Sequence, residues 1–222
     1  MDTQKNRTDS RTALLRAARD LIFTHSFEHV GTAEICERAG VRKGSLYHFF
    51  SSKEDLVLAM LDEMMVEFER EVLVPSLAGP GSIGERVDAF VQAIHAFESA
   101  VQRESGHVPG CPFGNLIVEA GTYSPGLRQA LKRHLDRVAG HFQRCLQESV
   151  DCGELPAHTD ARTLAERWLA LMEGILVMTK MHQDPATILR LGPALHVLLG
   201  VPGPHARPGD QIPVPADPNA SS

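Results

Sequence analysis

The sequence is short of several features, and each shortage excludes a class of protein. No apolar run in the 222 residues reaches the ~18–20 that a membrane-spanning helix needs, so we expect no transmembrane segment. There are four cysteines (Cys36, Cys111, Cys145 and Cys152) and no C-x-x-C pair, which predicts reduced thiols rather than a disulfide framework. The N-terminal region has no uninterrupted apolar stretch before a small-residue cleavage site, so we expect a cytoplasmic protein.

The chain also lacks the motifs of common catalytic sites. It has no nucleophile elbow, no phosphate-binding glycine loop and no H-E-x-x-H, so we expect neither an enzyme nor a cofactor. Two alternatives stay open. Cys111 served by His107 or a distant histidine is conceivable as the nucleophile of a thiol enzyme. His141 and Cys145, four residues apart, form a conceivable metal pair, although we predict no metal site.

An excess of positive charge is missing as well, because the formal net charge is −6. The charge is unevenly distributed, however. Residues 1–53 carry nine Lys/Arg and six Asp/Glu, a net charge of +3, and residues 54–222 carry −9. This asymmetry is typical of a chain whose N-terminal end faces nucleic acid while the remainder is an acidic body.

Helical periodicity runs through nearly the whole chain, and we find no strand pattern. We therefore predict an all-α fold of about nine helices. Capping residues open several of them: Ser52, Ser82, Ser124 and Asp160. We expect Pro75 to end the helix that starts after Ser52, and Asp184-Pro185 to open one last helix. Six of the 14 prolines lie in the last 22 residues, which predicts a disordered tail over 201–222.

The most informative segment runs from Thr32 to Lys53 and has the pattern of a helix-turn-helix. Thr32 is a good N-cap, and Gly40 can adopt the left-handed conformation that ends the first helix. The second helix would then present polar side chains to a DNA groove and its phosphates. Its predicted DNA contacts, with those of the flanking positions, are Thr32, Arg42, Lys43, Gly44, Ser45, Tyr47, His48 and Lys53. A plain helical hairpin with solvated charges is the alternative.

This segment resembles the signature of the TetR (tetracycline-repressor-like) family of transcriptional regulators. The matching residues are Thr32, Ile35, Ala39-Gly40-Val41, Lys43-Gly44, Leu46-Tyr47, Phe49-Phe50 and Lys53-Glu54-Asp55-Leu56. The resemblance implies a homodimer that reads a pseudo-palindromic double-stranded operator and is released from it by a small molecule, with repression the family default. It implies a DNA-binding domain over 1–52 and a ligand-binding and dimerisation domain over 53–200.

The second informative segment is Gly110 to Gly121. Cys111 falls at a predicted helix N-terminus, where the helix dipole can lower the pKa of a thiol. Asn115 and Glu119 follow on the same face of that helix. The segment is similar to one in TetR-like regulators that respond to electrophiles such as quinones or acrylate, which implies a sensor role for Cys111. The alternative is a small residue that only caps the helix, with Asn115 and Glu119 bracing its neighbours.

Other candidate ligand contacts are Phe97, Phe142, Trp168 and Met172, which we expect to face the interior of the bundle. Most such residues in any helical protein are ordinary core, and Trp168 is the strongest candidate to touch a ligand. The last two long helices carry more than one apolar stripe, so one stripe can face a partner subunit, as the resemblance implies. A helical partner-binding module without DNA affinity is the remaining alternative.

Overall fold

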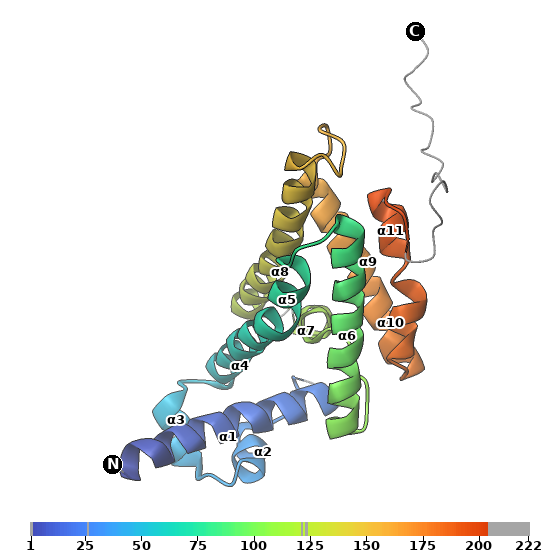
Figure 1. Ribbon diagram of the computed structural model, residues 1–222. Helices are drawn as coiled ribbons and strands as arrows, with labels where there is room; N and C mark the ends of the chain where they lie inside the picture. Colours follow the sequence, from blue (N-terminus) through green and yellow to red (C-terminus); the bar gives the residue numbers. More distant parts are fainter. Residues whose placement is uncertain (1, 26, 121, 123, 204–222) are drawn as a thin grey trace.

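In the computed structural model the chain is built from helices arranged as a small N-terminal unit and a larger bundle (Figure 1). The structure describes residues 2–25, 27–120, 122 and 124–203, so the predicted tail lies, after Gly203, outside the described residues. The elements are α1 (Asp2–Thr24), α2 (Thr32–Arg38), α3 (Lys43–Phe49), α4 (Lys53–Phe68), the π-helical turn η1 (Glu69–Leu73), α5 (Val74–Leu77), α6 (Ile83–Ser105), α7 (Pro112–Ala120), α8 (Pro125–Asp151), α9 (Ala161–His182), α10 (Ala186–Leu191) and α11 (Ala194–Leu199).

The all-helical prediction is confirmed, with an N-terminal helix-turn-helix and a C-terminal helical domain. When α4, η1 and α5 are counted as one rod and α10 with α11 as another, the described residues hold nine helical segments. Over the same residues, no helix has both the length and the apolar character that crossing a bilayer requires.

The N-terminal caps predicted at Ser52, Ser82, Ser124 and Asp160 form as expected. The side-chain oxygens of Ser52 and Ser124 each accept a hydrogen bond from the backbone N–H three residues on. Ser82 does the same and completes a capping box with Glu85. Asp160 accepts from two backbone N–H groups of α9. Each cap satisfies donors that the first helical turn leaves unpaired, which explains why the starts of these helices were readable from the sequence.

The prediction that Pro75 ends its helix is wrong. The rod continues through Pro75 to Leu77, because α4 widens into the π-helical turn η1 and a new α-helical turn begins at Val74. Pro75 therefore sits in the first turn of α5, where its missing N–H leaves no hydrogen bond unmade. Glu69, at the start of η1, is held by Arg137 and His141 of α8 at 2.5 and 3.0 Å.

The single last helix expected after Asp184-Pro185 is in fact two short ones, α10 and α11. Pro193 stands between them and has no N–H to continue the helical ladder. The preceding Gly192 packs directly against Val91 of α6: a Cβ at Gly192 would lie 2.6 Å from a Val91 methyl carbon. The break in the helix thus lets α10 and α11 lie closely on α6.

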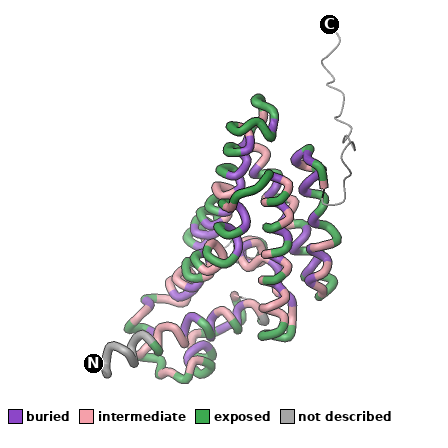
Figure 2. The backbone as a smooth tube through the Cα atoms, in the orientation of Figure 1, coloured by how far each residue is buried: buried purple, intermediate pink, exposed green. Residues whose placement is uncertain are grey.

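Three aromatic rings form the centre of the C-terminal bundle. Phe142 stacks in parallel on Trp168 with ring centroids 4.5 Å apart, and Phe90 meets both rings edge-on at 5.2 and 5.7 Å. All three are at most 1% exposed. Figure 2 shows the buried positions along the inward sides of the helices that supply these rings, α6, α8 and α9. The trio therefore joins the three longest helices of the bundle.

Truncation of the Phe142 side chain tests this arrangement. Phe142→Ala removes a fully buried ring and two aromatic contacts, so we expect the free energy of unfolding to fall by about 3–5 kcal/mol. Denaturant titration at fixed protein concentration measures the change. Val197→Ala, at a side chain that is 69% exposed, is the matched control and should change stability by less than about 0.5 kcal/mol. A loss below about 1 kcal/mol for Phe142→Ala would contradict the assignment.

Candidate DNA-binding surface and ligand cavity

Helices α2 and α3 form the helix-turn-helix that the sequence predicts. Gly40 between them adopts the left-handed conformation with φ 66°. The N–H of Val41 donates to the carbonyl of Cys36 at 3.0 Å and closes the turn. Ile35 of α2 and Leu46 of α3 are fully buried. These contacts hold α3 at a set angle on α1 and α2.

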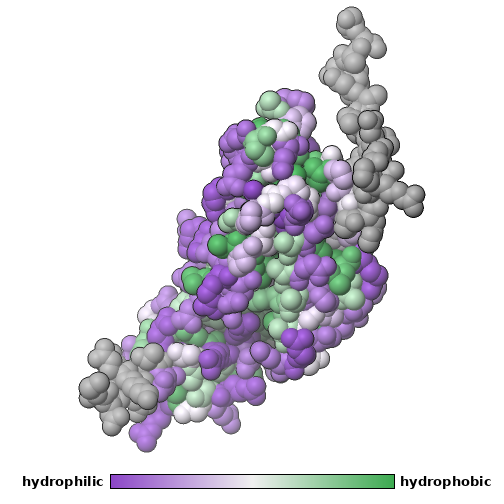
Figure 3. Space-filling view, viewed as in Figure 1, coloured by the Kyte–Doolittle hydropathy of each residue, from purple (hydrophilic) through white to green (hydrophobic). Residues whose placement is uncertain are grey.

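The outward side of α3 is free of packing. Five of the predicted DNA contacts are exposed there or just before it: Arg42, Lys43, Gly44, Tyr47 and His48. Ser45 is half-buried, and its N–H donates to the carbonyl of Arg42 at 2.8 Å. In Figure 3 the N-terminal unit shows mostly hydrophilic side chains on the face in view. The side chains of α3 are thus available to a duplex, and their contacts with DNA stay a prediction.

Thr32 does not cap α2, so that part of the prediction is wrong. The capping residue is Gly31, whose extended backbone precedes the helix and which makes no side-chain cap. The N–H of Ile35 donates to the Gly31 carbonyl at 3.1 Å. Thr32 is the first residue of α2 and is half-buried, and its contact with the DNA backbone stays a prediction.

Lys53 has partners within the N-terminal unit. Its Nζ donates to the carbonyls of Phe27 and Val30 at 2.8 and 3.1 Å, and it lies 4.3 Å from the centroid of the Phe27 ring. The ammonium group therefore ties the connection between α1 and α2 to the start of α4. A phosphate contact by Lys53 stays a prediction, and it would have to compete with these internal bonds.

An apolar cavity of about 60 Å³ lies inside the C-terminal bundle. It is bounded by side chains of α4, α6, α7, α8 and α9, together with Cys111 just before α7. The lining residues are Met64, Glu67, Phe68, Phe90, Ile94, Phe97, Glu98, Cys111, Pro112, Phe113, Leu135, Val138, Phe142, Leu169, Met172, Glu173 and Leu176. Four of the predicted ligand contacts, Phe97, Cys111, Phe142 and Met172, are thus brought together around one space.

The other three predicted ligand contacts lie elsewhere. Trp168 is behind the cavity wall, stacked on Phe142, so the strongest sequence candidate is a core residue. Asn115 donates to the carbonyl of Pro109 at 2.9 Å and accepts from Nζ of Lys180 at 3.1 Å, which braces the loop before α7 against α9. The bracing alternative describes this residue better than a ligand contact does.

Glu119, the third of these residues, is also absent from the lining of the cavity. One of its carboxylate oxygens accepts from the backbone N–H of Glu28 at 3.2 Å. The side chain therefore links α7 to the loop that follows α1. Because Glu28 leads into the helix-turn-helix, this bond joins the C-terminal bundle to the N-terminal unit.

Cys111 sits at the start of α7 as predicted, and its sulfur accepts a hydrogen bond from the N–H of Gly114 at 3.3 Å. The expected lowering of the thiol pKa is wrong. Burial and the neighbouring carboxylate of Glu173 raise the pKa of Cys111 well above its ordinary value, against the smaller opposite effect of the Gly114 N–H. Desolvation outweighs the helix terminus here.

Two acidic residues of the cavity wall, Glu98 and Glu173, are missed by the sequence interpretation. Glu98 is 4% exposed, and its carboxylate accepts from the N–H of Gly110 at 3.3 Å. Burial raises its pKa to about 7. Glu173 is half-buried beside Cys111, and burial raises its pKa too. A signal was present, because Glu98 falls on the apolar stripe of its helix and Glu173 interrupts an apolar run.

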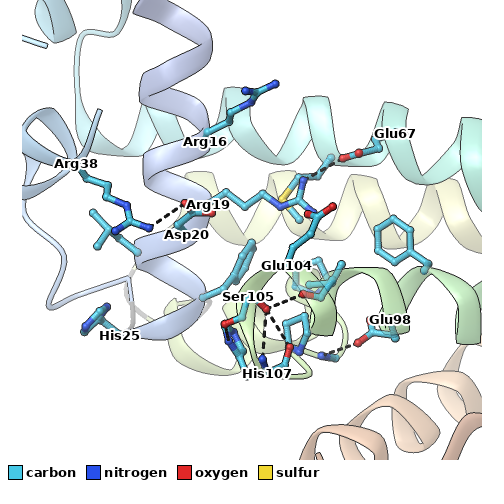
Figure 4. Close-up of a pocket in the computed structure, with 18 residues that line it drawn as sticks. Arg16, Arg19, Asp20, His25, Arg38, Glu67, Glu98, Glu104, Ser105 and His107 are labelled. Carbon is cyan, nitrogen blue, oxygen red and sulfur yellow. Dashed lines mark hydrogen bonds and ion pairs between the residues drawn. The ribbon is translucent and has the colours of Figure 1, made fainter. Parts of the chain in front are cut away.

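A wider groove of about 760 Å³ leads from the surface to this cavity. It runs between α1 and the C-terminal half of α6, and the two spaces share five lining residues: Met64, Glu67, Phe97, Glu98 and Pro112. Figure 4 shows Arg16, Arg19, Arg38 and Asp20 of the N-terminal unit on one side and Glu98 and Glu104 of α6 on the other, with Arg19 paired to Glu67 of α4 at 3.0 Å. The groove and the cavity thus adjoin along this shared wall.

The conceivable metal pair has other partners. His141 contacts Glu69 at 3.0 Å, and Cys145 lies 3.9 Å from the guanidinium group of Arg86. Over the described residues no cluster of three or more His, Cys, Asp or Glu side chains is suited to hold a metal ion.

Comparison with known proteins identifies both halves of the chain. Residues 14–60 match the family described as bacterial regulatory proteins, tetR family. Residues 84–195 match the family described as tetracyclin repressor-like, C-terminal domain. The two matches cover the helix-turn-helix and the greater part of the bundle that encloses the cavity.

Individual relatives agree with these matches. The transcriptional regulator AcuR of Cereibacter sphaeroides is 31% identical over 173 residues, which are 78% of this chain and 77% of that protein. The HTH-type transcriptional repressor NemR of Escherichia coli is 27% identical over 168 residues, 72% of this chain and 81% of that protein. The crystal structure of regulatory protein TetR from Rhodobacter sphaeroides superposes with a TM-score of 0.74 at 27% identity, covering 85% of this chain and 98% of the other.

The buried acid of α6 gives this bundle a distinctive pH dependence. Folding raises the pKa of Glu98 from 4.5 to about 7, so the folded chain binds a proton that the unfolded chain has lost between these values. We therefore expect the free energy of unfolding to fall by about 3 kcal/mol as the pH rises through that range. In Glu98→Gln this contribution should be absent, and the fall should shrink accordingly. Denaturant titrations at pH 5 and pH 8 measure it.

Glu104→Gln is the control, because Glu104 lies on the same helix but is exposed. This variant should keep the pH dependence of the wild type. The assignment to Glu98 fails if Glu98→Gln loses as much stability between pH 5 and pH 8 as the wild type does.

Proposed function

The chain belongs to the TetR family of bacterial DNA-binding transcriptional regulators, and on that basis we propose that it is a homodimeric repressor which a small molecule releases from its operator. Regulators of this family are not enzymes, so the thiol-enzyme alternative falls away. The observation that carries the proposal is the groove that connects the helix-turn-helix unit to an internal cavity.

Residues 1–52 act as the DNA-binding domain in this proposal, with α3 in the major groove. Arg42, Lys43, Tyr47 and His48 project from the exposed side of α3 and its N-terminal flank, which supports contacts with base edges and phosphates. A dimer would place two copies of α3 about 34 Å apart, one helical turn of DNA, on a pseudo-palindromic duplex. Its overall negative charge makes specificity depend on these few placed side chains rather than on bulk attraction.

Residues 53–200 act as the ligand-binding and dimerisation domain, with α8 and α9 as the dimer interface. The two helices pack along each other within the subunit. Their outer surface keeps apolar side chains in solvent: Val177 and Met181 of α9 are each 63% exposed. Burial of these side chains against a second copy would remove apolar surface from water and stabilise a two-fold dimer.

Release from DNA follows from the position of α4, which lines the cavity and packs on α1. Met64 and Phe68 of α4 face the cavity, while Glu63 and Glu67 of the same helix pair with Arg11 and Arg19 of α1. A ligand that enlarges the cavity would displace α4 and with it the N-terminal unit. A ligand that binds the displaced conformation more tightly shifts the population away from the DNA-binding state.

Cys111 is the proposed reaction site of an electrophilic inducer. It lines the cavity at the point where the groove enters, next to Pro112, which borders both spaces. Alkylation of its sulfur would add volume to a cavity of only about 60 Å³. The packed walls would then have to move, because protein interiors have little free space.

The DNA-binding role predicts a change in salt dependence. Lys43→Ala removes an exposed cation at the start of α3, so we expect weaker binding to all sequences and a salt slope reduced by about 1 per subunit. Fluorescence anisotropy with promoter DNA from the chain's own operon, at 50–300 mM KCl, measures the slope. Arg190→Ala on α10 is the control and should leave it unchanged. An unaltered slope for Lys43→Ala would refute the phosphate contact.

The sensor role predicts which thiol controls release. Cys111→Ser should bind DNA normally and stay bound when N-ethylmaleimide is added, because the reacting sulfur is gone. Cys152→Ser is the matched control: Cys152 is the exposed thiol, and its loss should leave release intact. Electrophoretic mobility shifts with and without the reagent make the comparison. Release of Cys111→Ser at the wild-type rate would rule out Cys111 as the sensor.

A further inference from the structure

Glu173 is the feature of the cavity that the proposed function does not yet use. Its carboxylate lines the cavity beside Cys111, whose Cβ lies 3.6 Å from the position that a Cβ at Gly114 would take. It also lies directly against Gly114, where an added Cβ would collide with a carboxylate oxygen. The carboxylate, the sulfur and the first turn of α7 are therefore packed together at one point of the wall.

The position of Glu173 bears on how the buried Cys111 thiol could react. The nucleophile in a thiol addition is the thiolate, and the surroundings of Cys111 disfavour the thiolate. An adjacent general base is one of the ways in which proteins activate such a nucleophile. Glu173 is that base by position, because its carboxylate and the Cys111 side chain both lie against Gly114 in the wall of the same cavity.

The charges around the cavity restrict the electrophile. Three carboxyl groups line it, those of Glu67, Glu98 and Glu173, and none of the described lining residues is a lysine, arginine or histidine. Arg19 neutralises Glu67 at 3.0 Å, but Glu98 and Glu173 have no such ion pair among the described salt bridges. An anionic compound would meet uncompensated negative charge in an apolar space.

We infer that Glu173 takes the proton of the Cys111 thiol when an uncharged α,β-unsaturated carbonyl compound adds to the sulfur. The sulfur forms a bond to the β-carbon as its proton passes to a Glu173 oxygen. The electrons of the C=C bond move toward the carbonyl oxygen and give an enolate. The proton then returns to the α-carbon, so Glu173 is again a carboxylate, the product is a neutral thioether and no oxidant is consumed.

Three other ionisable groups border this site and must be considered in any pH profile. Glu98 approaches from α6 and has a pKa of about 7. Glu67 approaches from α4 and is paired with Arg19. His134 of α8 lies behind Phe113, with ring centroids 5.2 Å apart, and burial lowers its pKa. Measurements between pH 8 and pH 9 fall above the titrations of Glu98 and His134.

The test is the rate at which N-ethylmaleimide modifies Cys111, followed by peptide mass spectrometry in full-length protein carrying Cys152→Ser. This inference rests on the proposed function, and different results of this experiment would contradict the inference and the proposed function. Absence of any adduct at Cys111 would contradict the proposed function, in which Cys111 is the site that reacts with the inducer. An adduct that forms at the wild-type rate in Glu173→Gln would leave Cys111 as the sensor and overturn only the role of Glu173.

Glu173→Gln separates a base from a merely structural or electrostatic neighbour, because the two roles predict changes of opposite sign. If Glu173 only repels the thiolate, its neutralisation lowers the thiol pKa and speeds the reaction. If it accepts the proton, we expect the reaction at pH 8 to slow at least tenfold. The rate should then rise about tenfold per pH unit, whereas the wild-type rate stays nearly flat from pH 8 to pH 9. Glu71→Gln, on η1 and outside both the groove and the cavity, should behave as wild type.

The charge preference is tested with 3-maleimidopropionate, which carries the same reactive ring and an added carboxylate. Each rate is divided by the rate of the same reagent with a small free thiol, which removes intrinsic reactivity. We expect N-ethylmaleimide to be favoured at least tenfold at pH 8, and Glu98→Gln to reduce that preference. Equal normalised rates for the two reagents would overturn the restriction to uncharged electrophiles.

Discussion

The contact between α1 and α4 is the one on which the rest of the molecule depends. It is an apolar seam to which Leu14 and Ala18 of α1 and Leu56 and Met60 of α4 contribute fully or almost fully buried side chains. Ion pairs between the two helices flank it. Helix α4 also belongs to the bundle, where it borders the cavity, so one rigid rod is shared by both halves. A change of volume in the cavity can therefore reach the helix-turn-helix without any flexible linker.

The composition of the cavity wall lowers the stability of the fold. A site filled only by apolar side chains would pack more tightly, and two carboxyl groups in its wall lose hydration that a single backbone N–H replaces only in part. If the proposed function holds, Glu98 and Glu173 are the places where ligand chemistry and fold stability compete. Phe90 and Phe142 form part of the cavity wall and pack on Trp168 behind it, so the free space lies on the side that adjoins the groove.

The sequence interpretation succeeded at most positions where a local signal decides the structure, although at Thr32 the preceding Gly31 is the cap instead. N-terminal caps act within one helical turn, so Ser82 and Asp160 could be recognised from their neighbours alone. It failed at Pro75, because a π-helical turn stabilised by α8 changes what proline does there. It failed again at the Cys111 pKa, because the helix terminus is a local effect and the stronger desolvation comes from helices distant in the chain.

The sequence by itself determined the helices, the helix-turn-helix and the family, since these follow from periodicity, capping and a short contiguous motif. Only the tertiary structure decided which side chains surround the cavity. It brought Glu98, Cys111 and Glu173 together from three separate segments, set Trp168 behind the wall and turned Glu119 toward Glu28. Helical periodicity specifies that a residue faces inward, whereas the packing of helices against one another specifies what it meets there.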